Sequence, residues 1–167
     1  MPSAKEKFKV FGFVFLCLFS LKCSRFFMLN DFSEYSEELT HIEKRVFQLV
    51  NQYRSSKNLP QLEDNQIITN AARSHSMEMG NHSVFFGHAY FHKRVNHIEN
   101  LIHVIDASEN VAKSQGFVDP AEVAFDAWIK SPSHLSNIEG KYNLTGIGVV
   151  KTKNDVYFLT QIFVLAP

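Results

Sequence analysis

Cysteine is scarce in this sequence and is confined to its first 25 residues. The two cysteines, Cys17 and Cys23, both lie in this segment, so a mature domain released from it contains none. Disulfide bonds then cannot stabilise that domain, and its stability has to come from a packed core. The content of 45% hydrophobic residues is sufficient for such a core. The sequence also lacks HExxH and CxxC motifs, which mark the most recognisable zinc sites.

The chain has no excess of charge of either sign, since 17 Lys and Arg balance 17 Asp and Glu. A nucleic-acid-binding protein needs a basic face to neutralise phosphates, so the composition argues against nucleic acid as a partner. The charges are unevenly distributed. Residues 1–29 hold five basic groups and one acid, which leaves 12 basic and 16 acidic groups, a net charge of −4, for the remainder. We therefore expect a short basic leader followed by a mildly acidic domain.

Long hydrophobic runs are absent, and the longest one covers only residues 10–21. A membrane-spanning helix needs about 18–20 apolar residues, whereas a short apolar run after several lysines is typical of a signal peptide. We interpret residues 1–25 as a signal peptide or an N-terminal anchor, and residues 26–38 as a polar spacer. Small residues do not mark a clear cleavage site, Lys22 disfavours lipid attachment at Cys23, and a wrongly assigned start is a further alternative. The leader predicts a secreted or cell-envelope protein that meets a membrane only through an uncleaved leader.

Hydrophobic periodicity predicts three helices in the body of the chain. The first covers residues 38–57, where apolar positions recur at helical spacing. The second starts at a capping residue, Asp64, and ends at Gly80, and the third has Asp119 as its N-cap and Pro120 in its first turn. Residues 146–150 and 156–165 are β-branched and aromatic, which predicts a C-terminal hairpin. With an irregular middle segment, this order indicates an α+β layered domain.

Histidine is the residue type that carries most information about function. His75 lies on the apolar stripe of the second predicted helix and is expected in the core, while the other histidines without a partner at ligand spacing are expected on the surface: His41, His82, His92, His97 and His103. His88 follows an aromatic pair and a glycine, His134 follows the third helix, and Glu109 interrupts a locally apolar segment. If these three groups converge from separate loops, the imidazoles can bind a divalent cation, with Glu109 as a ligand or an orienting partner. The alternative is that each makes a separate structural hydrogen bond.

Arg94 is a further candidate beside this site. Its guanidinium can pair with Glu109 or with an anionic ligand, or it can form a salt bridge with a purely structural role.

Six ordered segments, spread over residues 39–165, together resemble the bacterial branch of the CAP superfamily, the SCP-like extracellular proteins related to plant pathogenesis-related proteins and venom allergens. The segments are Val50-Asn51-x-x-Arg54, Ala71-Ala72-x-x-His75-Ser76-x-x-Met79, Phe86-x-His88, Ser108-Glu109-Asn110-Val111-Ala112, Trp128-x-x-Ser131-Pro132-x-His134-x-x-Asn137-Ile138 and Gly146-Ile147-Gly148-Val149. The resemblance implies a CAP/SCP domain over residues 39–167, folded as a three-layer α-β-α sandwich with a central cleft.

The same resemblance implies a set of site residues. In the family, the cleft is lined by two histidines and two acidic residues and can hold Zn²⁺ or another divalent cation. His88 matches the first histidine, Glu109 the acid of the Glu-Asn motif and His134 the second histidine. The second acid has no counterpart, because residues 129–132 read Ile-Lys-Ser-Pro. The resemblance therefore implies a weakly held ion with His88 and His134 as its ligands.

Three functions are compatible with the sequence. The first is an exported, non-catalytic binding module. Its cleft takes one of three kinds of ligand, namely a small apolar molecule such as a lipid, or a peptide, or a glycan, with or without a divalent metal. The alternative is a metal-assisted hydrolase of an envelope or extracellular substrate, in which His88 and His134 hold Zn²⁺ and Glu109 is the catalytic general base. The third is a structural envelope protein with a vestigial cleft.

Overall fold

The computed structural model describes residues 17–116 and 119–167, with side chains from residue 37 onward. The first 16 residues of the predicted leader lie outside the described residues. The chain divides into two units, Met1–Glu37 and Glu38–Pro167, and the second contains the sheet. Within residues 17–116 and 119–167, no helix combines the length and the apolar character needed to span a membrane.

The described elements are five helices and four strands. The helices are α1 (Cys17–Ser56), α2 (Gln66–Gly80), α3 (Phe91–Glu99), α4 (Pro120–Lys130) and α5 (Pro132–Glu139). The strands are β1 (Glu63–Asp64), β2 (Asp106–Gln115), β3 (Leu144–Lys151) and β4 (Val156–Leu165). They form one mixed sheet in the order β1-β3-β4-β2, in which β1 pairs in parallel with β3 and all other pairs are antiparallel.

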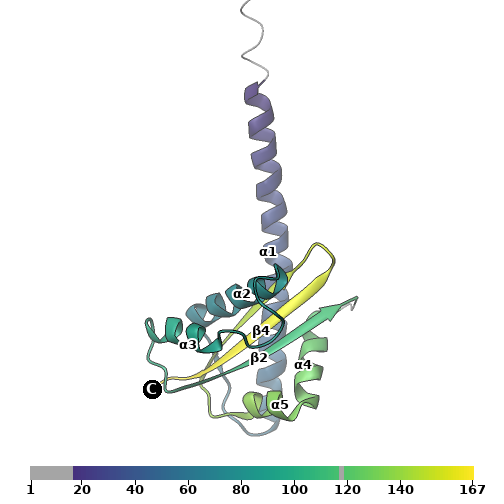
Figure 1. The fold of residues 1–167 in the computed structure, drawn as a ribbon. Helices are drawn as coiled ribbons and strands as arrows, with labels where there is room; N and C mark the ends of the chain where they lie inside the picture. The colour runs from purple at the N-terminus through teal and green to yellow at the C-terminus, as the bar shows by residue number, and fades with distance from the viewer. Residues whose placement is uncertain (1–16, 117–118) are drawn as a thin grey trace, which may run out of the picture. The chain divides into compact units, whose positions relative to one another are not determined.

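The two faces of the sheet are covered by different helices (Figure 1). Successive residues of a strand point to opposite faces, and β4 follows this rule with Leu159 and Phe163 on one side and Ile162 and Val164 on the other. The first face packs against residues of α1, α4 and α5, and the second against α2 and α3. The predicted α+β class and three-layer α-β-α sandwich are thus confirmed.

Two glycines of β3 allow α2 to lie directly on the sheet. A Cβ atom at Gly146 would come within 2.2 Å of the Thr69 nitrogen, and one at Gly148 within 2.1 Å of the Arg73 nitrogen. The residues between and after them, Ile147 and Val149, face the opposite layer and are buried there. The alternation of glycine with β-branched residues therefore sets the distance between the helix and the strand.

Three details of the secondary-structure prediction are confirmed. The hairpin is present as β3 and β4, the third predicted helix is α4, and the Asp119 carboxylate accepts hydrogen bonds from the backbone nitrogens of Ala121 (3.0 Å) and Glu122 (3.1 Å).

Other details were wrong. The first helix begins at Cys17 rather than at residue 38, and α2 is capped by Asn65 rather than by Asp64. The middle segment is also not irregular, because it contains α3 and β2. α3 follows Tyr90 in a left-handed conformation (φ 58°) and has no side-chain cap, so it carries no start signal. β2 is an edge strand with several polar residues, so its apolar alternation is weak.

Candidate functional site

The candidate site is built around Glu109, in the middle of edge strand β2. Its side chain points toward the α2 and α3 layer and is buried, with the residue only 5% exposed. A carboxylate in such a position requires a partner. Arg94 of α3 supplies it through two hydrogen bonds, from Nε to Oε2 (2.9 Å) and from Nη2 to Oε1 (2.8 Å). The predicted pairing of Arg94 with Glu109 is therefore present, in bidentate form.

The loop before α3 carries His88 and is held by two hydrogen bonds to its backbone. Arg94 Nη1 donates a hydrogen bond to the carbonyl oxygen of Ala89 (2.6 Å), and His75 Nε2 lies 2.8 Å from the carbonyl oxygen of Gly87. Because a carbonyl only accepts, Nε2 of His75 carries the proton. Gly87 itself has a φ of +140°, which disfavours any residue with a side chain. His75 is fully buried, as predicted, and helps to position the loop.

His88 is the third group of the cluster. Its Nδ1 lies 3.0 Å from Oε1 of Glu109, a distance at which Nδ1–H donates to the carboxylate. This hydrogen bond leaves Nε2 as the free acceptor of a neutral ring. The side chain is 49% exposed, so the ring remains accessible to a ligand.

His134 reaches the same place from the opposite layer, on α5. Its ring centroid lies 6.4 Å from that of His88, at an interplanar angle of 45°. Two asparagines fix its backbone: Asn110 Nδ2 donates to the carbonyl oxygen of His134 (3.1 Å), and Asn137 Nδ2 donates to Oδ1 of Asn110 (2.8 Å). Both asparagines belong to motifs of the sequence, although their bracing role was not predicted.

The pKa of His134 is lowered by burial and, to a smaller extent, by the nearby His88. The ring is therefore neutral at pH 7, and its lone pair is available. A lowered histidine pKa also means that the unfolded chain binds more protons, so this residue destabilises the fold as pH falls below the ordinary histidine value of about 6.5.

Edge strand β2 brings the two layers together. Glu109 faces α2 and α3, whereas the next residue, Asn110, faces α5, so one short segment contacts groups from both sides of the sheet. His88, Glu109 and His134 consequently lie side by side. The expectation that all three come from separate loops was wrong, since only His88 lies in a loop, while Glu109 is in a strand and His134 is in a helix.

A divalent ion at this cluster would find two imidazoles as its principal donors. Both oxygens of Glu109 already accept hydrogen bonds from Arg94, and the cationic guanidinium repels a second cation nearby. Among the described residues, no group of three or more His, Cys, Asp or Glu side chains is arranged to hold a metal. Catalytic zinc usually has three protein ligands. The donors present fit only a weakly held ion bound through His88 and His134.

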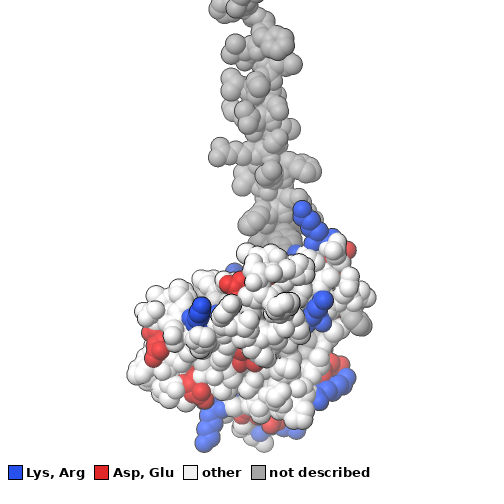
Figure 2. Space-filling view, viewed as in Figure 1, with Lys and Arg blue, Asp and Glu red and all other residues white. Residues whose placement is uncertain are grey.

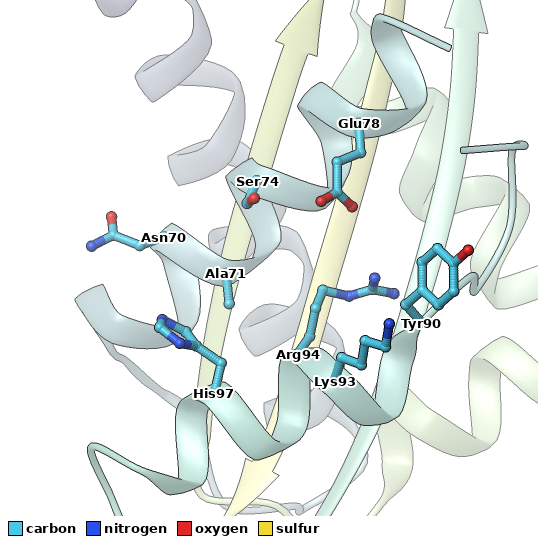
Figure 3. Close-up of a pocket in the computed structure, with 8 residues that line it drawn as sticks. All are labelled: Asn70, Ala71, Ser74, Glu78, Tyr90, Lys93, Arg94 and His97. Carbon is cyan, nitrogen blue, oxygen red and sulfur yellow. The ribbon is translucent and has the colours of Figure 1, made fainter. Parts of the chain in front are cut away.

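A pocket of about 480 Å³ lies between α2 and α3, and the Arg94 residue that binds Glu109 forms part of its lining (Figure 3). This pocket was not predicted from the sequence, because α3 was not predicted. On the face shown in Figure 2, acidic and basic side chains alternate, and neither sign forms a continuous patch.

Comparisons with known proteins agree with this architecture. The model of the family "CAP: Cysteine-rich secretory protein family" matches residues 47–163. No match was found among curated proteins.

Solved structures with the same fold come from several bacteria. An extracellular protein containing a SCP domain from Bacillus anthracis matches with a TM-score of 0.68 and 24% identity, over 80% of this chain and 43% of that one. An outer surface protein from Borrelia burgdorferi matches with a TM-score of 0.66 and 16% identity, over 76% and 94% of the two chains. A cysteine-rich secretory protein from Staphylococcus aureus matches with a TM-score of 0.59 and 23% identity, over 77% and 39%. The chain thus spans less than half of the first and third of these proteins.

Proposed function

The chain belongs to the CAP family of cysteine-rich secretory proteins, and from this premise we propose that it is an extracytoplasmic, non-catalytic binding domain. His88 and His134 form its ligand-contacting surface, and Glu109 orients His88. The observation that supports this proposal most directly is the state of Glu109, which is buried and bound by Arg94 on both oxygens while the two imidazoles beside it stay accessible.

The same observation argues against the hydrolase alternative. A general base has to accept a proton from a water molecule within hydrogen-bond reach. Neither oxygen of Glu109 is free of Arg94, and Oε1 also accepts from His88. Glu109 therefore serves to hold Arg94 and His88 in place, which favours binding over hydrolysis.

The chemistry of the rings favours a ligand with polar groups. An imidazole with Nδ1–H bound to Glu109 presents an acceptor at Nε2, which matches a hydroxyl or amide N–H of the ligand. Peptides and glycans carry such groups, and a purely apolar ligand does not. Among the three ligand classes that the sequence suggests, we therefore propose a peptide or a glycan, with a divalent cation as an optional, weakly bound addition.

A titration of the purified full chain tests this function. Two polar, uncharged probes, triacetylchitotriose and acetyl-hexaalanine amide, and one fatty-acid probe, palmitate, are added separately while the histidine ring signals are followed by NMR. We expect one of the polar probes to shift the signals of His88 and His134. Binding by palmitate alone, or release of product from either polar probe, would contradict the proposal.

Zinc titration of the same protein by calorimetry tests the metal part. We expect weak Zn²⁺ binding that falls by about 10-fold or more in His88→Ala and in His134→Ala, with the fold unchanged. Binding should also weaken at acidic pH, because protonation removes the coordinating lone pair, and the lowered pKa of His134 keeps its lone pair available to a pH below the ordinary histidine value. His41→Ala, which removes an exposed histidine of α1, is the matched control. Full affinity in both site variants would show that the rings do not form the site.

We further propose that the protein is exported. The basic and apolar leader supports this, and two structural relatives are described as an extracellular and an outer surface protein. Fractionation of the native cells, followed by mass spectrometry of the N-terminus, is expected to find the domain outside the cytoplasm. A cytoplasmic chain that still carries residues 1–21 would contradict export.

A further inference from the structure

The pocket between α2 and α3 is separate from the His88–His134 pair. Its volume of about 480 Å³ is in the range of small-molecule sites. α2 contributes Asn70, Ala71, Ser74 and Glu78, while Tyr90 and α3 contribute Lys93, Arg94 and His97. Lys93 and His97 are four residues apart on α3 and therefore lie on the same face of that helix.

The two walls of the pocket carry opposite charges. In Figure 3 the Glu78 carboxylate points from α2 toward the side chains of α3, and the Lys93 ammonium points back toward α2. Lys93 Nζ lies 4.5 Å from the centre of the Tyr90 ring, and within the described part of the chain it has no acidic partner. Arg94 contributes no net charge, because Glu109 neutralises it. The pocket therefore offers one available anion and one available cation.

A buried histidine, His75, lies beside the Glu78 end of the pocket. His75 Nδ1 is fully buried, has no hydrogen-bond partner and lies 3.5 Å from Oε2 of Glu78. Nε2 of His75 carries the proton that is donated to Gly87, which leaves Nδ1 as the ring atom that faces Glu78. The Glu78 side chain itself is 42% exposed, so its carboxylate can be reached by the ammonium group of a ligand.

We infer that this pocket binds a small zwitterion, namely an amino acid or a short peptide with both termini free. The ligand ammonium binds the exposed carboxylate of Glu78, and the ligand carboxylate binds Lys93 and His97 on the opposite wall. The charge balance disfavours the alternatives: a phosphate dianion would leave Glu78 facing negative charge, and a divalent cation would leave Lys93 facing positive charge. This site extends the protein's chemistry beyond the proposed histidine surface and does not depend on it.

Three related probes test the inference by NMR titration of the full chain. Glycylglycine carries both charges, N-acetylglycylglycine only the carboxylate, and glycylglycinamide only the ammonium. We expect glycylglycine to bind with a millimolar Kd and to shift the amide signals of Ser74 and Lys93. Each singly charged probe should bind about 3- to 5-fold more weakly, the effect of one exposed charge interaction. Equal affinities for the three probes, or shifts confined to other regions, would overturn the inference.

Matched variants assign the two ends of the ligand. Lys93→Gln should weaken glycylglycine binding and leave glycylglycinamide binding unchanged, since the latter has no carboxylate. Glu78→Gln should weaken glycylglycine and leave N-acetylglycylglycine unchanged. Lys141→Gln, an exposed lysine outside the pocket, is the control, and His134→Ala should not alter glycylglycine binding. If both Lys93→Gln and Glu78→Gln bind glycylglycine as the wild type does, the pocket is not its site.

Discussion

Replacement of Trp128 by alanine is expected to lower the free energy of unfolding by about 3–5 kcal/mol. Trp128 is the largest fully buried side chain of the described region, 1% exposed, and packs in the core shared by α1, α4 and the sheet. Its indole also has a polar role, because Nε1 donates a hydrogen bond to the carbonyl oxygen of Val111 (3.0 Å). Val111 lies on edge strand β2, so this bond ties α4 to the edge of the sheet.

The two contributions of Trp128 can be separated by a second substitution. Trp128→Phe keeps an aromatic ring in the core but removes the donor, and we expect a smaller loss of about 1–3 kcal/mol. Urea unfolding of the full chain, followed by circular dichroism, measures both values. Met77→Ala removes a side chain that is 57% exposed and serves as the control with little expected effect. A Trp128→Ala protein as stable as the wild type would mean that the ring does not hold α4 against the sheet.

Arg54→Met is expected to have a comparable effect, a loss of about 3–5 kcal/mol. Arg54 is 1% exposed, and its guanidinium donates to four backbone carbonyls, those of Pro60 (2.7 Å), Ile138 (2.8 Å), Gly140 (2.9 Å) and Tyr142 (3.3 Å). Methionine fills a similar volume but has no donor, so these carbonyls lose their partner inside the protein. Each buried carbonyl left unpaired costs about 1–3 kcal/mol, and solvent entry at the partly buried ones reduces the sum.

The geometry of the side chain matters as well as its charge. Burial lowers the pKa of Arg54 from its ordinary value, but a guanidinium stays charged under all physiological conditions. Arg54→Lys keeps the charge and loses the planar arrangement of donors, so we expect an intermediate loss. Arg45→Met removes a half-exposed arginine that pairs with Glu122 and should cost less than about 1 kcal/mol. If Arg54→Met is no less stable than Arg45→Met, the four hydrogen bonds contribute nothing.

Local patterns in the sequence were sufficient for much of the fold. Two helix predictions rest on residues that are neighbours in the chain: the apolar spacing within residues 38–56, and the helix start at Asp119–Pro120. The structure has helices at both places, α1 and α4. The β-branched hairpin formed for the same reason. The segment from residue 81 to 115 escaped prediction because its signals are not local. α3 starts without a capping side chain, and β2 gains its hydrogen bonds from β4, which lies about fifty residues later in the sequence.

The sequence by itself determined the layered α+β class and, through its ordered motifs, the family, together with the identity of the candidate site residues. It did not determine how those residues are paired. Arg94 binds Glu109 through its Nε and Nη2 atoms because α3 packs beside edge strand β2. His134 approaches His88 because α5 packs on the other side of that strand. The pocket between α2 and α3 likewise exists only once these two helices pack side by side on one face of the sheet. Only the tertiary structure decided these contacts, because each joins side chains that no local pattern connects and that sheet pairing and helix packing bring together.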